Sequence, residues 1–326
     1  MCTLAEEGFE APLGTVPGYA PAGGTMRRFG MLSSRLAVAL CLVSVITTSA
    51  CSSSSSTPPK ITADGQAGWA QVWMANFAGP ANTGVDTSQW EYQTGQGVFG
   101  GTEIETMTSS TQNVHLDGHG DLDITAVRDG SSWTSGRLST KNTGFAAPAG
   151  GEMMVTASIL QPGPPDAPNA LGYWPAFWML GPGSWPEHGE IDILEDANGM
   201  SDHSGTFSCG PSEQGPCEQP SGLGTGLVPC PGCQDTYNVY SVVIDRRHPS
   251  NEQIRWYLNN HEFFSVSERN IGASAWTEAV DHGFVIILDL AMGGQYPEEK
   301  CDCTAPNDQT TSGGTMSVRD LAVYQR

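Results

Sequence analysis

The chain has 326 residues, a formal net charge of −21 and only 14 lysine and arginine residues. Nucleic acid and anionic membrane surfaces are bound by basic patches, so this composition excludes both as primary partners. Glycine (40) and proline (22) are abundant while charged residues make up 15%, which is typical of many short strands joined by turns. We therefore expect a neutral or weakly charged substrate.

The first 51 residues have the pattern of an N-terminal extension followed by an export signal. A basic segment that opens at Met26, where translation can begin, leads into the apolar run 36–46, which is short for a membrane span. Small residues then precede Cys51, as in a bacterial lipoprotein cleavage box. The serine-rich stretch 52–65 is expected to be a flexible tether. We expect an extracellular or cell-surface domain, either lipid-anchored at Cys51 or freely secreted.

Residues 66–326 alternate short strand patterns with turn signals and form one predicted domain. In the stretch 113–127, a turn separates two strands, and the second strand alternates polar with apolar residues. Further strands are predicted over Met153–Leu160, Trp174–Leu180, Glu190–Glu195, Tyr237–Ile244, Ile254–Leu258, His261–Val266, Phe284–Met292 and Met316–Tyr324. A short helix is expected over 273–279, and loops over 161–173 and 210–234. The pattern predicts an all-β sandwich of two antiparallel sheets.

Six cysteines follow Cys51, and an even number in an exported domain favours disulfides. They are Cys209, Cys217, Cys230, Cys233, Cys301 and Cys303. Their pairing stays open, because six cysteines allow about 15 pairings. The alternative is zinc held by the pairs 230/233 and 301/303, although the C-x-C half departs from the usual spacing of zinc fingers. We expect disulfide-bonded loops and no bound metal.

The stretch Glu190–Glu195 places three acids on one short strand. Side chains alternate along a strand, so Glu190 and Asp192 share a face while the isoleucines beside them point into the core. Strict alternation would put Leu194 on the acidic face. A one-residue β-bulge is therefore needed to return Glu195 to that face.

Carboxylates gathered on one face repel one another, and this repulsion raises the pKa of at least one of them. A protonated acid beside an ionised carboxylate is what glycosidic bond cleavage requires. With the bulge, Glu190 and Glu195 are four strand steps apart, or about 13 Å between Cα atoms at about 3.3 Å per step. Their side chains must lean inward to reach the separation of about 5–5.5 Å that retaining enzymes use. The alternative is an ordinary edge strand with solvated acids.

Three tryptophans precede the acidic strand, at positions 174, 178 and 185. Sugar-binding sites need aromatic faces on which the apolar side of a pyranose can stack. Clustered tryptophans also fill cores, but three within twelve residues favour at least one exposed platform beside the acids.

These residues resemble glycoside hydrolase family 16, the jelly-roll β-glucanases. The Glu-x-Asp-x-x-Glu signature of the family, in the bulged form of its laminarinase-like branch, appears at 190–195 after the run Trp-Pro-Ala-Phe-Trp at 174–178. The similarity extends to Ser-Gly-Arg-Leu-Ser-Thr-Lys at 135–141 and to 287–297. It implies a jelly-roll β-sandwich with a concave substrate cleft over 66–326.

The resemblance also implies roles for individual residues. Glu190 matches the nucleophile, Asp192 the assisting aspartate and Glu195 the general acid/base. The implied substrate-binding residues are Trp185 at the central subsite, Trp174 and Trp178 on the cleft-side strand, Glu103, and Gln295, which stands where the family often has asparagine. We expect strand alternation to allow one of Trp174 and Trp178 to face inward.

We expect a monomeric, retaining endo-glycosidase that hydrolyses β-1,3-glucan or mixed-linkage β-1,3/1,4-glucan and needs no cofactor. A structural calcium is known in the family, but the family aspartate in the closing strand appears here as Arg319. The alternatives are a transglycosylase or galactan hydrolase of the same fold, a non-catalytic carbohydrate-binding protein, and a structural lipoprotein of the cell surface.

Overall fold

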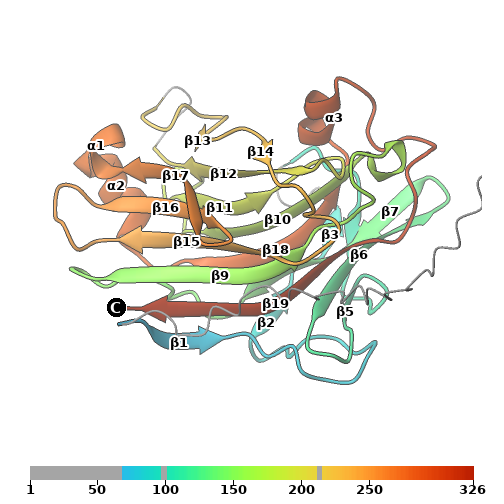
Figure 1. The fold of residues 1–326 in the computed structure, drawn as a ribbon, viewed down its shortest axis with the longest axis horizontal. Coiled ribbons are helices and arrows are strands. Elements are labelled where there is room, and N and C mark those ends of the chain that lie inside the picture. The colour runs from blue at the N-terminus through green and yellow to red at the C-terminus, as the bar shows by residue number, and fades with distance from the viewer. Residues whose placement is uncertain (1–67, 97–100, 211–214) are drawn as a thin grey trace, which may run out of the picture. The chain divides into compact units, whose positions relative to one another are not determined.

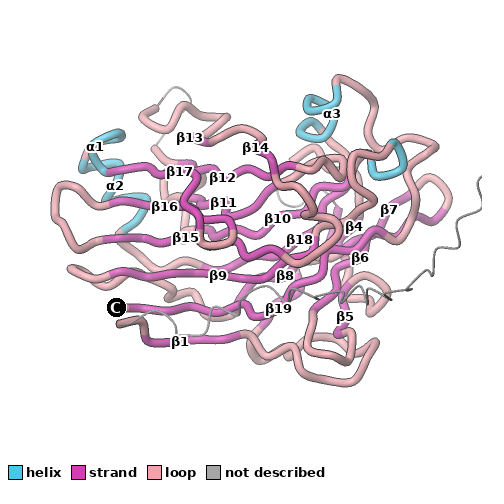
Figure 2. Tube along the Cα trace, viewed as in Figure 1, coloured by secondary structure: helices cyan, strands magenta, loops and turns pink. Residues whose placement is uncertain are grey.

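The structure is a computed structural model that describes residues 68–96, 101–210 and 215–326. Strands dominate the described residues, and short helices lie toward the ends of the sheets (Figures 1 and 2). The α-helices are α1 (Glu268–Ile271), α2 (Ala273–Val280) and α3 (Gln295–Cys301). None of the described helices is long and apolar enough to cross a membrane. The predicted extension, export signal, lipid anchor at Cys51 and tether lie outside the described residues.

One sheet has eleven strands in the order β17-β16-β15-β9-β19-β6-β7-β4-β3, with β1 paired to β19 and β5 to β6. Its strands are β1 (Ala70–Met74), β3 (Gly95–Gln96), β4 (Thr106–Met107), β5 (Val114–Leu116), β6 (Leu122–Asp129), β7 (Ser132–Ser135), β9 (Glu152–Leu160), β15 (Asn238–Asp245), β16 (Gln253–Leu258), β17 (His261–Ser267) and β19 (Gly314–Gln325). Neighbouring strands pair antiparallel except β4 and β7, which are parallel.

The other sheet has eight strands in the order β13-β12-β11-β10-β18-β8-β2, with β14 paired to β12. Its strands are β2 (Trp90–Tyr92), β8 (Arg137–Thr140), β10 (Tyr173–Leu180), β11 (Glu190–Glu195), β12 (Asp202–Ser208), β13 (Leu223–Gly224), β14 (Val228–Pro229) and β18 (Val285–Met292). The predicted sandwich of antiparallel sheets is confirmed. The acidic strand β11 is held on both sides, by β10 and β12.

The apolar core lies between the sheets and is built from alternate side chains of each strand. From the eight-stranded sheet, Phe177 and Leu288 are fully buried in it, and from the eleven-stranded sheet Val155 and Trp256 meet them in the same cluster. The remaining side chains of β10, β11 and β18 therefore project from the opposite face of the eight-stranded sheet. That face carries the site described below.

Most predicted strands appear within a few residues of their expected ends, and the predicted helix at 273–279 is α2. Three elements near the site were not predicted: β2, β12 and α3. Strand β12 reads Asp-His-Ser-Gly-Thr-Phe-Ser, which has no clean alternation of polar and apolar residues. Its strand form comes from pairing with β11, a tertiary contact that local pattern does not reveal.

The six cysteines of the domain form three disulfides between sequence neighbours: Cys209–Cys217, Cys230–Cys233 and Cys301–Cys303. The expected disulfide-bonded loops are confirmed. The four cysteines of the alternative zinc site belong to two separate disulfides, so their thiols are not available as ligands. No group of three or more histidine, cysteine or acidic side chains in the described residues could hold a metal ion.

Candidate active site

A β-bulge brings the three acids of β11 to one face, as the sequence predicted. Strand β10 pairs with Leu194 and then directly with Asp192, so Ile193 is the extra residue. Ile193 and Leu194 are both buried in the core. The next side chain, that of Glu195, is thereby returned to the face that carries Glu190 and Asp192.

The acids open into a cleft of about 640 Å³ on the outer face of the eight-stranded sheet. The cleft crosses β11, β10, β18 and β8. Its lining residues are Gln93, Gly101, Glu103, Arg137, Trp174, Ala176, Trp178, Leu180, Trp185, Glu190, Asp192, Glu195, Asp289 and Ala291. The structure therefore gathers the three predicted catalytic acids and four of the five predicted substrate-binding residues in one place.

The three tryptophans contact carboxylates in this cleft. Trp174 donates its indole hydrogen to Glu195 Oε1 over 3.0 Å, and the Trp185 side chain acts on Glu190 by lowering its pKa. Trp185 is 53% exposed and so is not a core residue. The expectation that one of Trp174 and Trp178 faces inward is wrong, because residues four apart on a regular strand share a face.

The two other predicted substrate-binding residues, Glu103 and Gln295, lie in different places. Glu103 lines the cleft, and its Oε2 atom is buried with no hydrogen-bond partner among the described residues. Gln295 begins helix α3 and lines a neighbouring groove instead, where its exposed side chain donates to Glu299 Oε1 over 2.6 Å. The expected place of Gln295 beside the catalytic acids is therefore not what the structure shows.

Two charged residues of the cleft were not singled out from the sequence. Asp289 on β18 pairs with Arg137 on β8 and, on its other side, with Ala176, which in turn pairs with Glu195. Asp289 Oδ1 accepts the indole hydrogen of Trp178 over 2.7 Å. A sequence signal existed: Asp289 is the single charged residue in the apolar strand Val-Ile-Ile-Leu-Asp-Leu-Ala-Met, and a charge in such a strand needs a partner.

Burial dominates the electrostatics of the acids. It raises the pKa of Glu190 to about 7, against the hydrogen bond from Trp185 and the charge of Arg137, which lower it. It raises the pKa of Glu195 to about 7 against the hydrogen bond from Trp174. The pKa of Asp192 is raised well above its usual range by burial and by the two glutamates. Near neutral pH the cluster can therefore hold one carboxyl group protonated beside an ionised one.

Comparison with known proteins identifies the family. The sequence model of the XgeA-like, catalytic GH16 domain matches residues 165–221, which include β10 and β11. The crystal structure of an endo-1,3-β-glucanase from Streptomyces sioyaensis has 40% sequence identity and a TM-score of 0.76, over 80% of this chain and 97% of that one. The chain belongs to glycoside hydrolase family 16.

Two further similar proteins have lower sequence identity. The glucan endo-1,3-β-glucosidase A1 of Niallia circulans is 30% identical over 79% of this chain, which spans only 38% of that protein. The endo-β-1,3-glucanase of Pyrococcus furiosus has 27% identity and a TM-score of 0.61, over 78% of this chain and 94% of that one. The expected jelly-roll fold is confirmed.

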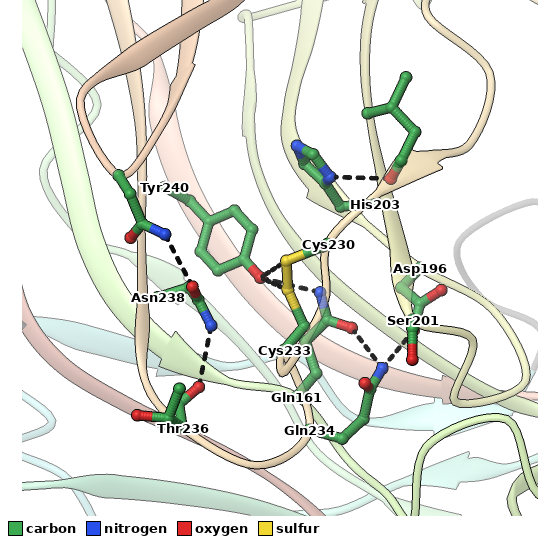
Figure 3. Close-up of a disulfide and its surroundings, with 12 residues drawn as sticks. Gln161, Asp196, Ser201, His203, Cys230, Cys233, Gln234, Thr236, Asn238 and Tyr240 are labelled. Carbon is green, nitrogen blue, oxygen red and sulfur yellow. Dashed lines mark hydrogen bonds between the residues drawn. A yellow bond between two sulfur atoms is a disulfide. The ribbon is translucent and has the colours of Figure 1, made fainter.

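A buried polar network holds the residue that follows the family 16 signature strand β11, on the side away from the cleft (Figure 3). Asp196 points away from the cleft, and its Oδ2 atom accepts a hydrogen bond from Gln234 over 3.4 Å. Gln234 also donates to Gln161, which donates to the hydroxyl of Tyr240. That hydroxyl lies 2.9 Å from Cys233 Sγ of the Cys230–Cys233 disulfide. The disulfide-bonded loop and the residue after Glu195 are thus parts of one packed unit.

The residues near the closing strand do not fit a calcium ion at the position that the family resemblance indicates. Arg319 stands where a carboxylate ligand would be required. Its guanidinium contacts Asp121 Oδ2 over 2.6 Å and lies 3.4 Å from the ring centre of Tyr237. A cation already neutralises this carboxylate, so these residues do not fit a calcium ion.

Proposed function

We propose that this family 16 protein is a retaining endo-glycosidase that hydrolyses β-1,3-glucan outside the cell. The observation that carries the proposal is the bulged strand β11, which presents Glu190, Asp192 and Glu195 together to a cleft bordered by indole groups. The β-1,3 linkage is supported by the glucanases named above. Extracellular location is supported by the export pattern and by three disulfides.

The geometry supports a double displacement. Ionised Glu190 attacks the anomeric carbon, while protonated Glu195 gives its proton to the glycosidic oxygen, which leaves with its half of the chain. Glu195, now ionised, takes a proton from water, and the resulting hydroxide displaces Glu190 from the glycosyl-enzyme. Asp192 lies between the two on the same face, where burial and the charges of both glutamates raise its own pKa, so the three carboxyl groups titrate together.

The test is to incubate the purified protein with laminarin, lichenan, agarose and xyloglucan and to size the products. We expect short oligosaccharides from laminarin, with the β-anomer appearing first in proton NMR spectra. Cleavage of lichenan would extend the activity to mixed linkages, and products longer than the substrate would indicate a transglycosylase. Binding of laminarin without any product would refute hydrolysis and favour the carbohydrate-binding alternative.

A further inference from the structure

We propose that Asp289 makes the cleft selective for uncharged β-glucan over β-glucan that carries anionic substituents. The proposal rests on the proposed function, because it names the substrate class of the same cleft. It assigns a specificity-determining role to a residue outside the catalytic signature.

Asp289 has the position that such a role requires. It is only 5% exposed, yet it lines the cleft. It lies on β18, which is separated from the acidic strand β11 by β10 alone. Ala176 pairs with Asp289 on one side and with Glu195 on the other. The side chain between the two carboxylates is therefore a single methyl group, and the floor of the cleft is open there to a bound sugar ring.

The Trp178 indole holds the Asp289 carboxylate in place, and Arg137 packs against that indole. Trp178 donates to its Oδ1 atom over 2.7 Å, and the guanidinium of Arg137 lies 4.7 Å from the centre of the Trp178 ring. Arg137 in turn donates through Nε to Gln93 Oε1 over 2.7 Å. Burial raises the pKa of Asp289, whereas Arg137 and the Trp178 indole lower it and so favour its charged form.

Arg137 is the one basic side chain among the described residues that line the cleft. Arginine is the usual partner of a sulfate or carboxylate group, because its planar fork of donors matches such anions. Here carboxylates already oppose its charge, with Asp289 acting most strongly and Glu103 next. Asp289 thus cancels the feature that would otherwise attract an anionic sugar.

A charged sugar substituent would then enter a cleft whose ionisable lining is mostly acidic. Besides Asp289, the described lining carries four acids, which are Glu103, Glu190, Asp192 and Glu195. Another cation, Lys300, lies on α3, with its ammonium 4.8 Å from the centre of the Tyr296 ring. Tyr296 packs on Trp174, at the Glu195 end of the cleft, so Lys300 does not offset the charge at Asp289.

The experiment compares laminarin with carboxymethylated laminarin of the same chain length, using the full-length protein. The measured quantity is the ratio of kcat/KM on the charged glucan to kcat/KM on the neutral one. We expect Asp289→Asn to raise this ratio roughly tenfold at low salt, because one unit of negative charge is removed from beside the sugar. Added salt should shrink the difference between variant and wild type.

Glu91→Gln is the matched control. Glu91 is an exposed acid on β2 of the same sheet and does not line the cleft, so its loss should leave the ratio unchanged. Because the control also lowers the net negative charge by one, it separates a local effect of Asp289 from the general repulsion between an acidic protein and a polyanion.

An unchanged ratio in folded Asp289→Asn would overturn the proposal, as would an equal rise in Glu91→Gln. If Asp289→Asn does not fold, Glu103→Gln must raise the ratio in its place, and no rise overturns the proposal. If the wild type cleaves neither glucan, the proposed function fails, and the same comparison of variants is made with the Kd values of the two glucans. Cleavage of laminarin with an unaltered ratio would leave the proposed function standing and remove only the role of Asp289.

Discussion

The indole nitrogen of Trp174 lies 3.0 Å from Oε1 of Glu195, so a residue that borders the cleft also contacts the general acid/base of the proposed mechanism. An N–H donor stabilises the ionised carboxylate and lowers its pKa. Burial acts in the opposite direction and raises that pKa to about 7. Trp174 therefore keeps the pKa of Glu195 lower than burial alone would make it.

Replacing Trp174 with phenylalanine removes this donor and keeps an aromatic ring. The pKa of Glu195 should rise, so the acid stays protonated to higher pH. We expect the basic limb of the kcat/KM profile on laminarin to move up by roughly one pH unit, since hydrogen bonds to charged groups contribute about 1.5–3 kcal/mol. Trp178→Phe is the control, because its donor serves Asp289; an equal shift in both variants would contradict the assignment.

Trp185→Ala should impair catalysis without unfolding the protein. The side chain is 53% exposed, so we expect a stability loss below about 1 kcal/mol, against the roughly 3–5 kcal/mol of a buried tryptophan. Losing its hydrogen bond should raise the pKa of Glu190, and the nucleophile must be ionised. The acid limb of the rate profile should therefore move to higher pH. A large fall in melting temperature would show that Trp185 is a core residue after all.

Glu105 gives a test of pH-dependent stability away from the proposed chemistry. Its carboxylate is 1% exposed and accepts the Met292 backbone N–H over 2.8 Å, and burial raises its pKa from 4.5 to about 7. The folded state holds this proton up to about pH 7, whereas the unfolded chain releases it near pH 4.5. Stability from this group is therefore full below pH 4.5 and is lost as pH rises to 7.

Glu105→Gln stays neutral and retains an acceptor for Met292, so it should escape this loss. Relative to wild type, the variant should gain on the order of 3 kcal/mol in the free energy of unfolding between pH 4.5 and 8. Urea unfolding of both proteins at the two pH values measures the difference. An equal difference in the free energy of unfolding between the two proteins at both pH values would mean that burial does not raise the pKa of Glu105.

The bulge in β11 could be predicted from the sequence because it depends on local alternation. Two acids at even spacing followed by Leu194 and Glu195 leave few other ways to place three carboxylates on one face. Local pattern marks Asp289 as a lone charge in an apolar strand but does not show that Arg137 and the acids of β11 lie near it, because that depends on the register of β8, β10 and β18.

Gln295 is placed beside the catalytic acids by the family resemblance, but the local backbone directs it into a neighbouring groove. Gly293 and Gly294 both have positive φ angles, of 66° and 86°, and turn the chain from β18 into α3. The backbone N–H of Gln295 then donates to a side chain, Thr102 Oγ1, over 2.6 Å. The side chain leaves the face of the sheet at this turn, which strand alternation alone does not predict.

The division of labour between the two glutamates is the sharpest test of the mechanism. Glu190→Ala should abolish hydrolysis of every glucan, because no glycosyl-enzyme can form without the nucleophile. Glu195→Ala should fail on laminarin but still form the intermediate from aryl glycosides whose leaving groups depart without protonation.

Azide separates the two roles. Added to Glu195→Ala with an aryl β-glycoside, it should attack the covalent intermediate and release a β-glycosyl azide, since a small anion needs no general base. Asp192→Asn should lose only part of the rate, because it alters a neighbour whose titration is linked to that of the glutamates but removes neither the nucleophile nor the acid. Mass spectrometry and NMR of the products decide the assignment. Rescue of Glu190→Ala to a β-glycosyl azide, or near-normal laminarin hydrolysis by either alanine variant, would mean that the roles given to Glu190 and Glu195 are wrong.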